Sequence, residues 1–225
     1  MSGLPAPVVI LISGRGSNLQ AILNETRAGR LPIEIRAVIS NNRTATGLQH
    51  AAAAGVPTEV IEHRGFPERT QFDRALMQAI DRYQPRLVIL AGFMRILGAE
   101  FIRHYAGRLL NIHPSLLPAF KGLDTHTRAL AAGAREHGAS VHFVTNDLDG
   151  GPVIIQAKVP VLADDTAETL AARVLEQEHR IFPLAIQWAA EERLTLRNGQ
   201  VLLDGGVQPE QGFGPLPARH ARVTK

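Results

Sequence analysis

The chain has 225 residues, of which 45% are apolar, a formal charge of +3 and no cysteine. This length fits one large α/β domain or two small ones, and the apolar share excludes a disordered chain. The lack of cysteine excludes disulfides, thiolate metal sites and cysteine nucleophiles, and we expect a cytoplasmic protein. With no Lys/Arg block, no secretory leader pattern and no apolar run of about 18 residues, we expect neither nucleic-acid binding nor membrane binding.

In the first half of the chain, short apolar runs alternate with amphipathic ones. The predicted strands are residues 8–12, 33–39, 58–61, 87–90 and 109–112. The predicted helices are residues 18–26, 46–54 and 68–82. Buried strands separated by helices are typical of a parallel sheet that helices cover on both faces. We therefore predict a doubly wound α/β fold.

The pattern changes in the second half. Residues 140–144 and 153–161 are predicted strands joined by a turn-rich stretch, and 166–192 is one long predicted helix. Asn198-Gly199 between two short apolar runs predicts a hairpin. We expect antiparallel additions to the sheet here, and a loose tail at 206–225 because its Gly, Pro and Arg residues show no periodicity.

The stretch 13–18, Ser-Gly-Arg-Gly-Ser-Asn, follows the first predicted strand and opens the first predicted helix. Glycines let a backbone approach a ligand closely, and the N-terminal amides of a helix attract phosphate. The stretch lacks both the third glycine of the dinucleotide fingerprint and the Gly-Lys-Ser/Thr of a P-loop. It therefore indicates either a site for a single phosphate or a structural turn.

Asn111, His113 and Pro114 lie where the fifth predicted strand ends. Ligands of open α/β sheets bind beyond this end, and strand alternation places Asn111 and His113 on one face. A histidine titrates near neutrality, and a carboxamide can donate to a developing oxyanion. The pair is a catalytic candidate, and a hydrogen-bonded structural histidine is the alternative.

Asp149 precedes Gly150 and Gly151, a pattern typical of a turn. If its carboxylate met His113, it would orient the ring and stabilise the protonated form, but sequence spacing does not establish that contact. Other histidines lack metal-ligand spacing to clustered carboxylates, so we predict no metal site. These are His126, His137, His142 and His179.

Together these segments resemble the glycinamide ribonucleotide transformylases, a family of folate-dependent formyltransferases in purine synthesis. The resemblance runs from about residue 8 to residue 205. It rests on five motifs in the same order as in the family: ISGRGSNLQ (12–20), LAGFMRIL (90–97), LNIHPSLLP (110–118), GASVHFV (138–144) and LDGGPVI (148–154).

The resemblance implies a Rossmann-like formyltransferase domain over 1–205, with a phosphate-binding half (about 1–105) and a catalytic, folate-binding half (about 106–205). It implies direct transfer of the formyl group of the cosubstrate 10-formyltetrahydrofolate to the amine of 5-phosphoribosylglycinamide. A tetrahedral oxyanion would form on the way, without a metal. The partners would be small molecules only, and the protein would be a monomer or a homodimer.

The resemblance also assigns residues. It makes Asn111, His113 and Asp149 the catalytic set. It assigns substrate binding to Gly16, Ser17, Asn18 and Glu178. It assigns folate binding to Arg69, Met94, Arg95, Ile96, Leu97 and Asn111.

One position departs from the family pattern, because Asp124 stands where we expect histidine; this concerns the details of a loop.

Other interpretations of the function stay open. The closest is a formyltetrahydrofolate hydrolase, or another formyltransferase on the same fold, in which case we expect an additional domain. A non-catalytic nucleotide-binding module is another. A dehydrogenase fits less well, for lack of the dinucleotide glycine pattern.

Overall fold

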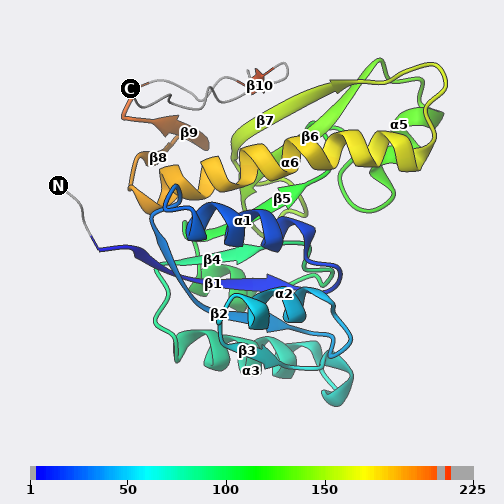
Figure 1. Ribbon diagram of the computed structural model, residues 1–225. Helices are drawn as coiled ribbons and strands as arrows, with labels where there is room; N and C mark the ends of the chain where they lie inside the picture. Colours follow the sequence, from blue (N-terminus) through cyan, green and yellow to red (C-terminus); the bar gives the residue numbers. More distant parts are fainter. Residues whose placement is uncertain (1–3, 207–210, 214–225) are drawn as a thin grey trace.

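The computed structural model describes residues 4–206 and 211–213 of the chain. In this part of the chain, eight strands form one sheet in the order β10-β7-β6-β5-β4-β1-β2-β3, and β8 and β9 form a separate hairpin (Figure 1). The strands are β1 (Ala6–Ile12), β2 (Ile33–Ser40), β3 (Thr58–Val60), β4 (Leu87–Leu90), β5 (Leu109–His113), β6 (Glu136–Phe143), β7 (Val153–Pro160), β8 (Leu194–Arg197), β9 (Gln200–Leu203) and β10 (Gln211–Phe213). The helices are α1 (Ser17–Arg27), α2 (Gly47–Ala53), α3 (Arg69–Asp81), α4 (Ala99–His104), α5 (Thr125–Ala131) and α6 (Ala167–Ala190), with a short 3-10 helix, η1 (His63–Gly65).

The sheet is parallel from β3 through β2, β1 and β4 to β5, whereas β6 runs antiparallel to both of its neighbours, β5 and β7. From β1 the chain builds outward through β2 to β3 and then returns to add β4 and β5 on the other side of β1. The strand order therefore reverses between β1 and β4. In doubly wound sheets, ligands bind at the carboxyl ends of the strands beside such a reversal.

Both faces of the central strands are covered, which explains why β1 is continuously apolar rather than alternating. Val8, Ile10 and Ile12 belong to the core on the side of α1 and α6, whereas Val9 and Leu11 pack with α3 and α4. Helices α1 and α6 lie side by side on their face of the sheet (Figure 1).

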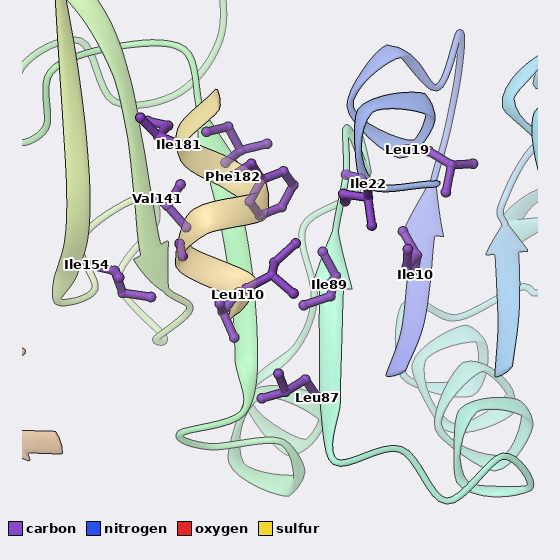
Figure 2. Close-up of a cluster of buried hydrophobic side chains, with 14 of the residues drawn as sticks. Ile10, Leu19, Ile22, Leu87, Ile89, Leu110, Val141, Ile154, Ile181 and Phe182 are labelled. Atoms are coloured by element: carbon purple, nitrogen blue, oxygen red, sulfur yellow. The ribbon is translucent and has the colours of Figure 1, made fainter. Parts of the chain in front are cut away.

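The core under α1 and α6 draws on both halves of the chain (Figure 2). Phe182 of α6 is fully buried there and extends toward the strands. The other side chains of this cluster that Figure 2 labels come from α1, α6 and the five strands β1, β4, β5, β6 and β7. These are Ile10, Leu19, Ile22, Leu87, Ile89, Leu110, Val141, Ile154 and Ile181.

The predicted fold class is confirmed, including the antiparallel addition in the second half. The predicted hairpin around Asn198-Gly199 is present as β8 and β9. Helices α4 and α5 were not predicted. Each is at most seven residues long, and α5 buries only Thr125 and Ala129, so neither shows an apolar period. The domain division stays a prediction; of the predicted tail 206–225, only Gly206 and β10 lie within the described residues.

Candidate functional site

His113 and Asp149 meet, although 35 residues that include all of β6 lie between them in sequence. His113 ends β5, and its Nδ1 lies 3.4 Å from Oδ2 of Asp149, which sits in the loop between β6 and β7. His113 is only 6% exposed. A carboxylate at this distance fixes the orientation of a buried imidazole ring. The contact between His113 and Asp149, which sequence spacing did not establish, is therefore present.

The second ring nitrogen of His113 is also engaged. Nε2 lies 3.0 Å from the carbonyl oxygen of Phe120, in the loop after β5. A carbonyl and a carboxylate both accept hydrogen bonds, so the doubly protonated imidazolium can donate at both nitrogens. Both ring nitrogens of His113 therefore face an oxygen atom that accepts hydrogen bonds.

The turn that carries Asp149 is constrained by close backbone approach. Asp149 has φ 47, in the left-handed region, and its Oδ2 accepts from the N–H of Gly122 at 2.9 Å. A Cβ on Gly151 would lie 1.8 Å from the carbonyl oxygen of Phe143, so only glycine fits there. The glycine after Asp149-Gly150 is therefore required by packing against β6, and it holds the carboxylate beside His113.

His142 belongs to this cluster, and the sequence did not indicate it. Its Nε2 lies 3.1 Å from Nδ2 of Asn111, and its Nδ1 lies 3.0 Å from the carbonyl oxygen of Phe143. Because that carbonyl only accepts, Nδ1 carries the proton and Nε2 accepts from the Asn111 amide. Burial lowers the pKa of His142, which agrees with a neutral ring.

This tautomer orients the Asn111 side chain. One of the two N–H groups of the Asn111 amide donates to His142, and this hydrogen bond fixes which way the carboxamide points. The second N–H remains available to a developing negative charge. What brings His142 to the site is the register of the sheet, in which Asn111 of β5 and His142 of β6 are cross-strand partners. Sequence patterns alone do not give this pairing.

The phosphate-loop candidate, residues 13–18, connects β1 to α1. Gly16 is the N-cap of α1, with φ 76, and no side chain caps this helix end, which leaves the first amides open to an anion. A Cβ on Gly16 would lie 2.6 Å from the Cα of Gly47, the first residue of α2. The glycine thus serves the close contact with α2 as well as the turn.

Asn18 and Glu178 join the first and last helices of the domain. Nδ2 of Asn18 donates to Oε2 of Glu178 at 2.6 Å. Glu178 is buried, and this burial raises the pKa of its carboxyl group, while the Asn18 amide opposes the shift. Within the described residues, Oδ1 of Asn18 is buried without a hydrogen-bond partner, which leaves one acceptor of this pair unsatisfied.

The remaining predicted residues form a separate group beside α3. In the segment 94–97, Met94 and Ile96 are 73% and 59% exposed. The guanidinium of Arg95 lies 5.0 Å above the Phe72 ring, and Arg69 contacts Asp73 of α3, with 3.9 Å between Nε and Oδ2. Arg69 therefore lies in a cluster with α3 and not with the His113 pair.

Two hollows adjoin these groups. One of about 560 Å³ lies among the loops that follow β1, β2, β3 and β4, and Ser13 and Met94 both line it. A smaller one of about 190 Å³ lies beside Asp149, with Leu117 and Lys121 in its wall. Both open at the carboxyl ends of the parallel strands, as the fold class requires.

Asp124, the departure from the expected pattern, is the N-cap of α5, with φ 55 and no side-chain cap hydrogen bond.

Over the described ranges, no group of three or more histidine, aspartate or glutamate side chains has the geometry of a metal site. No helix in those ranges is long and apolar enough to cross a membrane.

Comparison with known proteins gives a consistent result. The formyl transferase family matches residues 6–186 of the chain. The phosphoribosylglycinamide formyltransferase of Escherichia coli is 53% identical over 92% of this chain and 97% of its own length. The structure of the enzyme of that name from Coxiella burnetii, in complex with CHES, is 54% identical with a TM-score of 0.88 and covers 93% of this chain and 99% of its own. Glycinamide ribonucleotide transformylase 1 of Symbiobacterium toebii is 46% identical with a TM-score of 0.87 over 89% of this chain and 95% of its own.

Proposed function

Because the chain belongs to the formyl transferase family, we propose that it transfers the formyl group of 10-formyltetrahydrofolate to the amine of 5-phosphoribosylglycinamide. The products are formylglycinamide ribonucleotide and tetrahydrofolate, in purine biosynthesis. The observation that carries this proposal is the convergence of Asn111, His113 and Asp149 at the end of β5. We further propose a cytoplasmic enzyme with small-molecule substrates, as a monomer or a homodimer.

The reaction needs an oxyanion to be stabilised and a proton to be moved. The substrate amine attacks the formyl carbon, and the carbonyl electrons move to oxygen to give a tetrahedral intermediate. The amine then loses a proton, the carbonyl re-forms as the bond from carbon to N10 of the folate breaks, and N10 gains a proton. No covalent bond to the enzyme is required.

Asn111 and His113 are assigned to the oxygen that becomes negative. The second N–H of Asn111 is unclaimed by His142 and can donate to this oxygen. We assign a cationic His113 to stabilise the same negative charge. To donate to that oxygen, Nε2 of His113 would first have to release the carbonyl oxygen of Phe120. One well-placed donor of this kind typically contributes about 3 kcal/mol to catalysis.

Asp149 is assigned to hold His113 and to assist proton transfer. Its Oδ2 is shared between His113 Nδ1 and the Gly122 N–H, while its Oδ1 lies 3.7 Å from His142 Nε2, beyond hydrogen-bond range. The hollow beside Asp149 has room for a water, and we assign this water a position between the amine and N10. Such a water would relay the proton, with Asp149 as its acceptor.

We assign substrate binding to two further groups, the phosphate loop with Glu178 and the cluster of Arg69 with the segment 94–97. Gly16, Ser17 and Asn18 would hold the phosphate on the open amides of α1, and Glu178 would meet the ribonucleotide near the free Oδ1 of Asn18. Arg69, the segment 94–97 and Asn111 would line the folate site. The exposed apolar side chains of Met94 and Ile96 suit an aromatic ligand.

The test is to incubate purified protein with 10-formyltetrahydrofolate, with and without 5-phosphoribosylglycinamide. Folate absorbance and the mass of the ribonucleotide product are followed together. Turnover that depends on the ribonucleotide and adds one formyl group to it is the expected result. Release of formate without the ribonucleotide would identify a hydrolase, and no turnover with intact binding would identify a non-catalytic module.

A further inference from the structure

The segment 94–97 is held at both ends by backbone hydrogen bonds to side chains from elsewhere in the fold. The N–H of Met94, its first residue, donates to Oγ of Ser13 at 2.7 Å. The N–H of Gly98, immediately after it, donates to Oδ2 of Asp73 at 2.8 Å. Ser13 follows β1 and Asp73 lies in α3, so the segment is fixed to two different elements.

Ser13 is itself held by residues of two other loops, the one after β2 and the one after β4. Its hydroxyl donates to Oδ1 of Asn41 at 2.7 Å, which turns a lone pair of the oxygen toward Met94. Its backbone N–H donates to the carbonyl of Gly92 at 3.0 Å, and its carbonyl accepts from Nδ2 of Asn42 at 3.3 Å. Three residues later the same loop reaches Gly16. Ser13 therefore sets the distance between the phosphate loop and the segment 94–97.

Asp73 anchors the other end at a cost to the fold. It is 3% exposed, and burial raises the pKa of its carboxyl group. A Cβ on Gly98 would lie 2.7 Å from Oδ2, so a side chain at this position would push the carboxylate away. Burying a carboxylate costs free energy, and Asp73 is nevertheless buried where it accepts from the N–H of Gly98. We take this as a sign that the fold needs an acceptor at this position.

We propose that Ser13 and Asp73 are positioning residues that hold the segment 94–97 in the geometry in which it binds the folate cosubstrate. The inference rests on the proposed function. Ser13 ties the folate site to the phosphate loop, so that the two substrates are held at one fixed separation, and Asp73 ties it to α3. A small error in this separation misplaces the formyl carbon relative to the amine.

The experiment compares paired variants in the full chain. Ser13→Ala and Asp73→Ala remove each acceptor, whereas Ser13→Thr and Asp73→Asn keep an oxygen in the same position. We expect the alanine variants to raise KM for 10-formyltetrahydrofolate about tenfold and to leave KM for the ribonucleotide within about twofold, as befits the loss of one acceptor from a partly buried donor. The conservative variants should stay within about threefold of the wild type.

Ser40→Ala is the matched control. The Ser40 hydroxyl donates to the Asn42 carbonyl at 2.9 Å and accepts from the Asn42 N–H at 3.1 Å, close to Ser13 but without a bond to the segment 94–97. It should lower Tm without a selective change in folate KM. Equal rises in both KM values, failure of the conservative variants to recover, or the same selective effect in Ser40→Ala would each overturn the proposal.

Binding measured apart from turnover separates this inference from the proposed function. Titration calorimetry with 10-formyltetrahydrofolate should show the same loss of affinity in the two alanine variants as the KM values show. If the wild type binds this folate but transfers no formyl group, the proposed function fails, and the comparison of affinities still decides whether Ser13 and Asp73 hold the segment.

Discussion

At the scale of single residues, the contact between His113 and Asp149 is one that a side-chain substitution can remove. We expect Asp149→Asn and His113→Ala each to reduce kcat/KM by about 100-fold or more, the usual scale for acid–base groups. Because the two act as a unit, the double variant should be little worse than either single one. Steady-state kinetics of the four proteins measure this.

The control for this cycle is Asp147→Asn, in the same loop. Asp147 carries the same charge, is 70% exposed at its side chain, and pairs with Lys121 at 3.0 Å. It should retain nearly full activity. Losses that multiply in the double variant would mean that His113 and Asp149 contribute independently and that the proposed pair is wrong.

Glu178 offers a second prediction at this scale, because its raised pKa relates stability to pH. A carboxyl group that binds its proton more tightly when folded than when unfolded lowers stability as pH rises from the unfolded pKa through the folded one. Glu178→Gln removes this effect. We expect the variant to have a higher Tm than the wild type at neutral pH and a smaller advantage well below the unfolded pKa, where the carboxyl group is protonated in both states.

The same variant should weaken ribonucleotide binding, since the proposed contact loses its charge. Differential scanning calorimetry across pH, together with KM for the ribonucleotide, measures both effects. A Tm below that of the wild type at neutral pH would show that the Asn18–Glu178 hydrogen bond outweighs the burial of the charge.

At the scale of elements, the contact between the start of α1 and the start of α2 makes a prediction about glycine. Gly16→Ala introduces both a positive-φ strain and a Cβ 2.6 Å from the Gly47 Cα. Gly29→Ala introduces only the strain, because Gly29 has φ +69 and no atom lies within 4 Å of the place its Cβ would take. We expect about 1 kcal/mol of destabilisation for Gly29→Ala and clearly more for Gly16→Ala.

Urea unfolding of both variants measures the difference, and ribonucleotide affinity should fall only in Gly16→Ala, because only there do α2 and the phosphate loop separate. Equal destabilisation by both substitutions would show that the loop yields without disturbing α2. Gly16→Val, a natural choice for testing phosphate binding, would confound the two effects, since its side chain meets Gly47 rather than open space.

The elements also show what the sequence could and could not predict. Strand β1 was predictable from its continuous apolar run, which burial on both faces imposes, and α3 and α6 were predictable from their helical apolar period. The short helix α5 was not, since its buried positions are the small residues Thr125 and Ala129. Asn111, His113 and Asp149 were identified from motifs, but His142 required the register of β5 against β6, which depends on three-dimensional pairing.

At the scale of the whole molecule, the two predicted halves share one sheet and one of its cores. Strands β4 and β5 pair directly, and Asn18 reaches Glu178 across 160 residues of sequence. We therefore expect a single cooperative unfolding transition, with calorimetric and van't Hoff enthalpies equal. Ribonucleotide and folate should each raise this one Tm. Two resolved transitions, only one of which responds to ribonucleotide, would instead show that the halves are separate domains.

Several contacts that orient the catalytic cluster end on the main chain. His113 faces the carbonyl of Phe120, Asp149 accepts from the N–H of Gly122, and His142 faces the carbonyl of Phe143. A side-chain replacement at position 120 or 143 keeps the carbonyl, so an alanine scan would score those two positions as tolerant even though the site depends on them. Resistance to a drug bound here would accordingly be hard to acquire through these two contacts, because a point mutation cannot delete a peptide carbonyl.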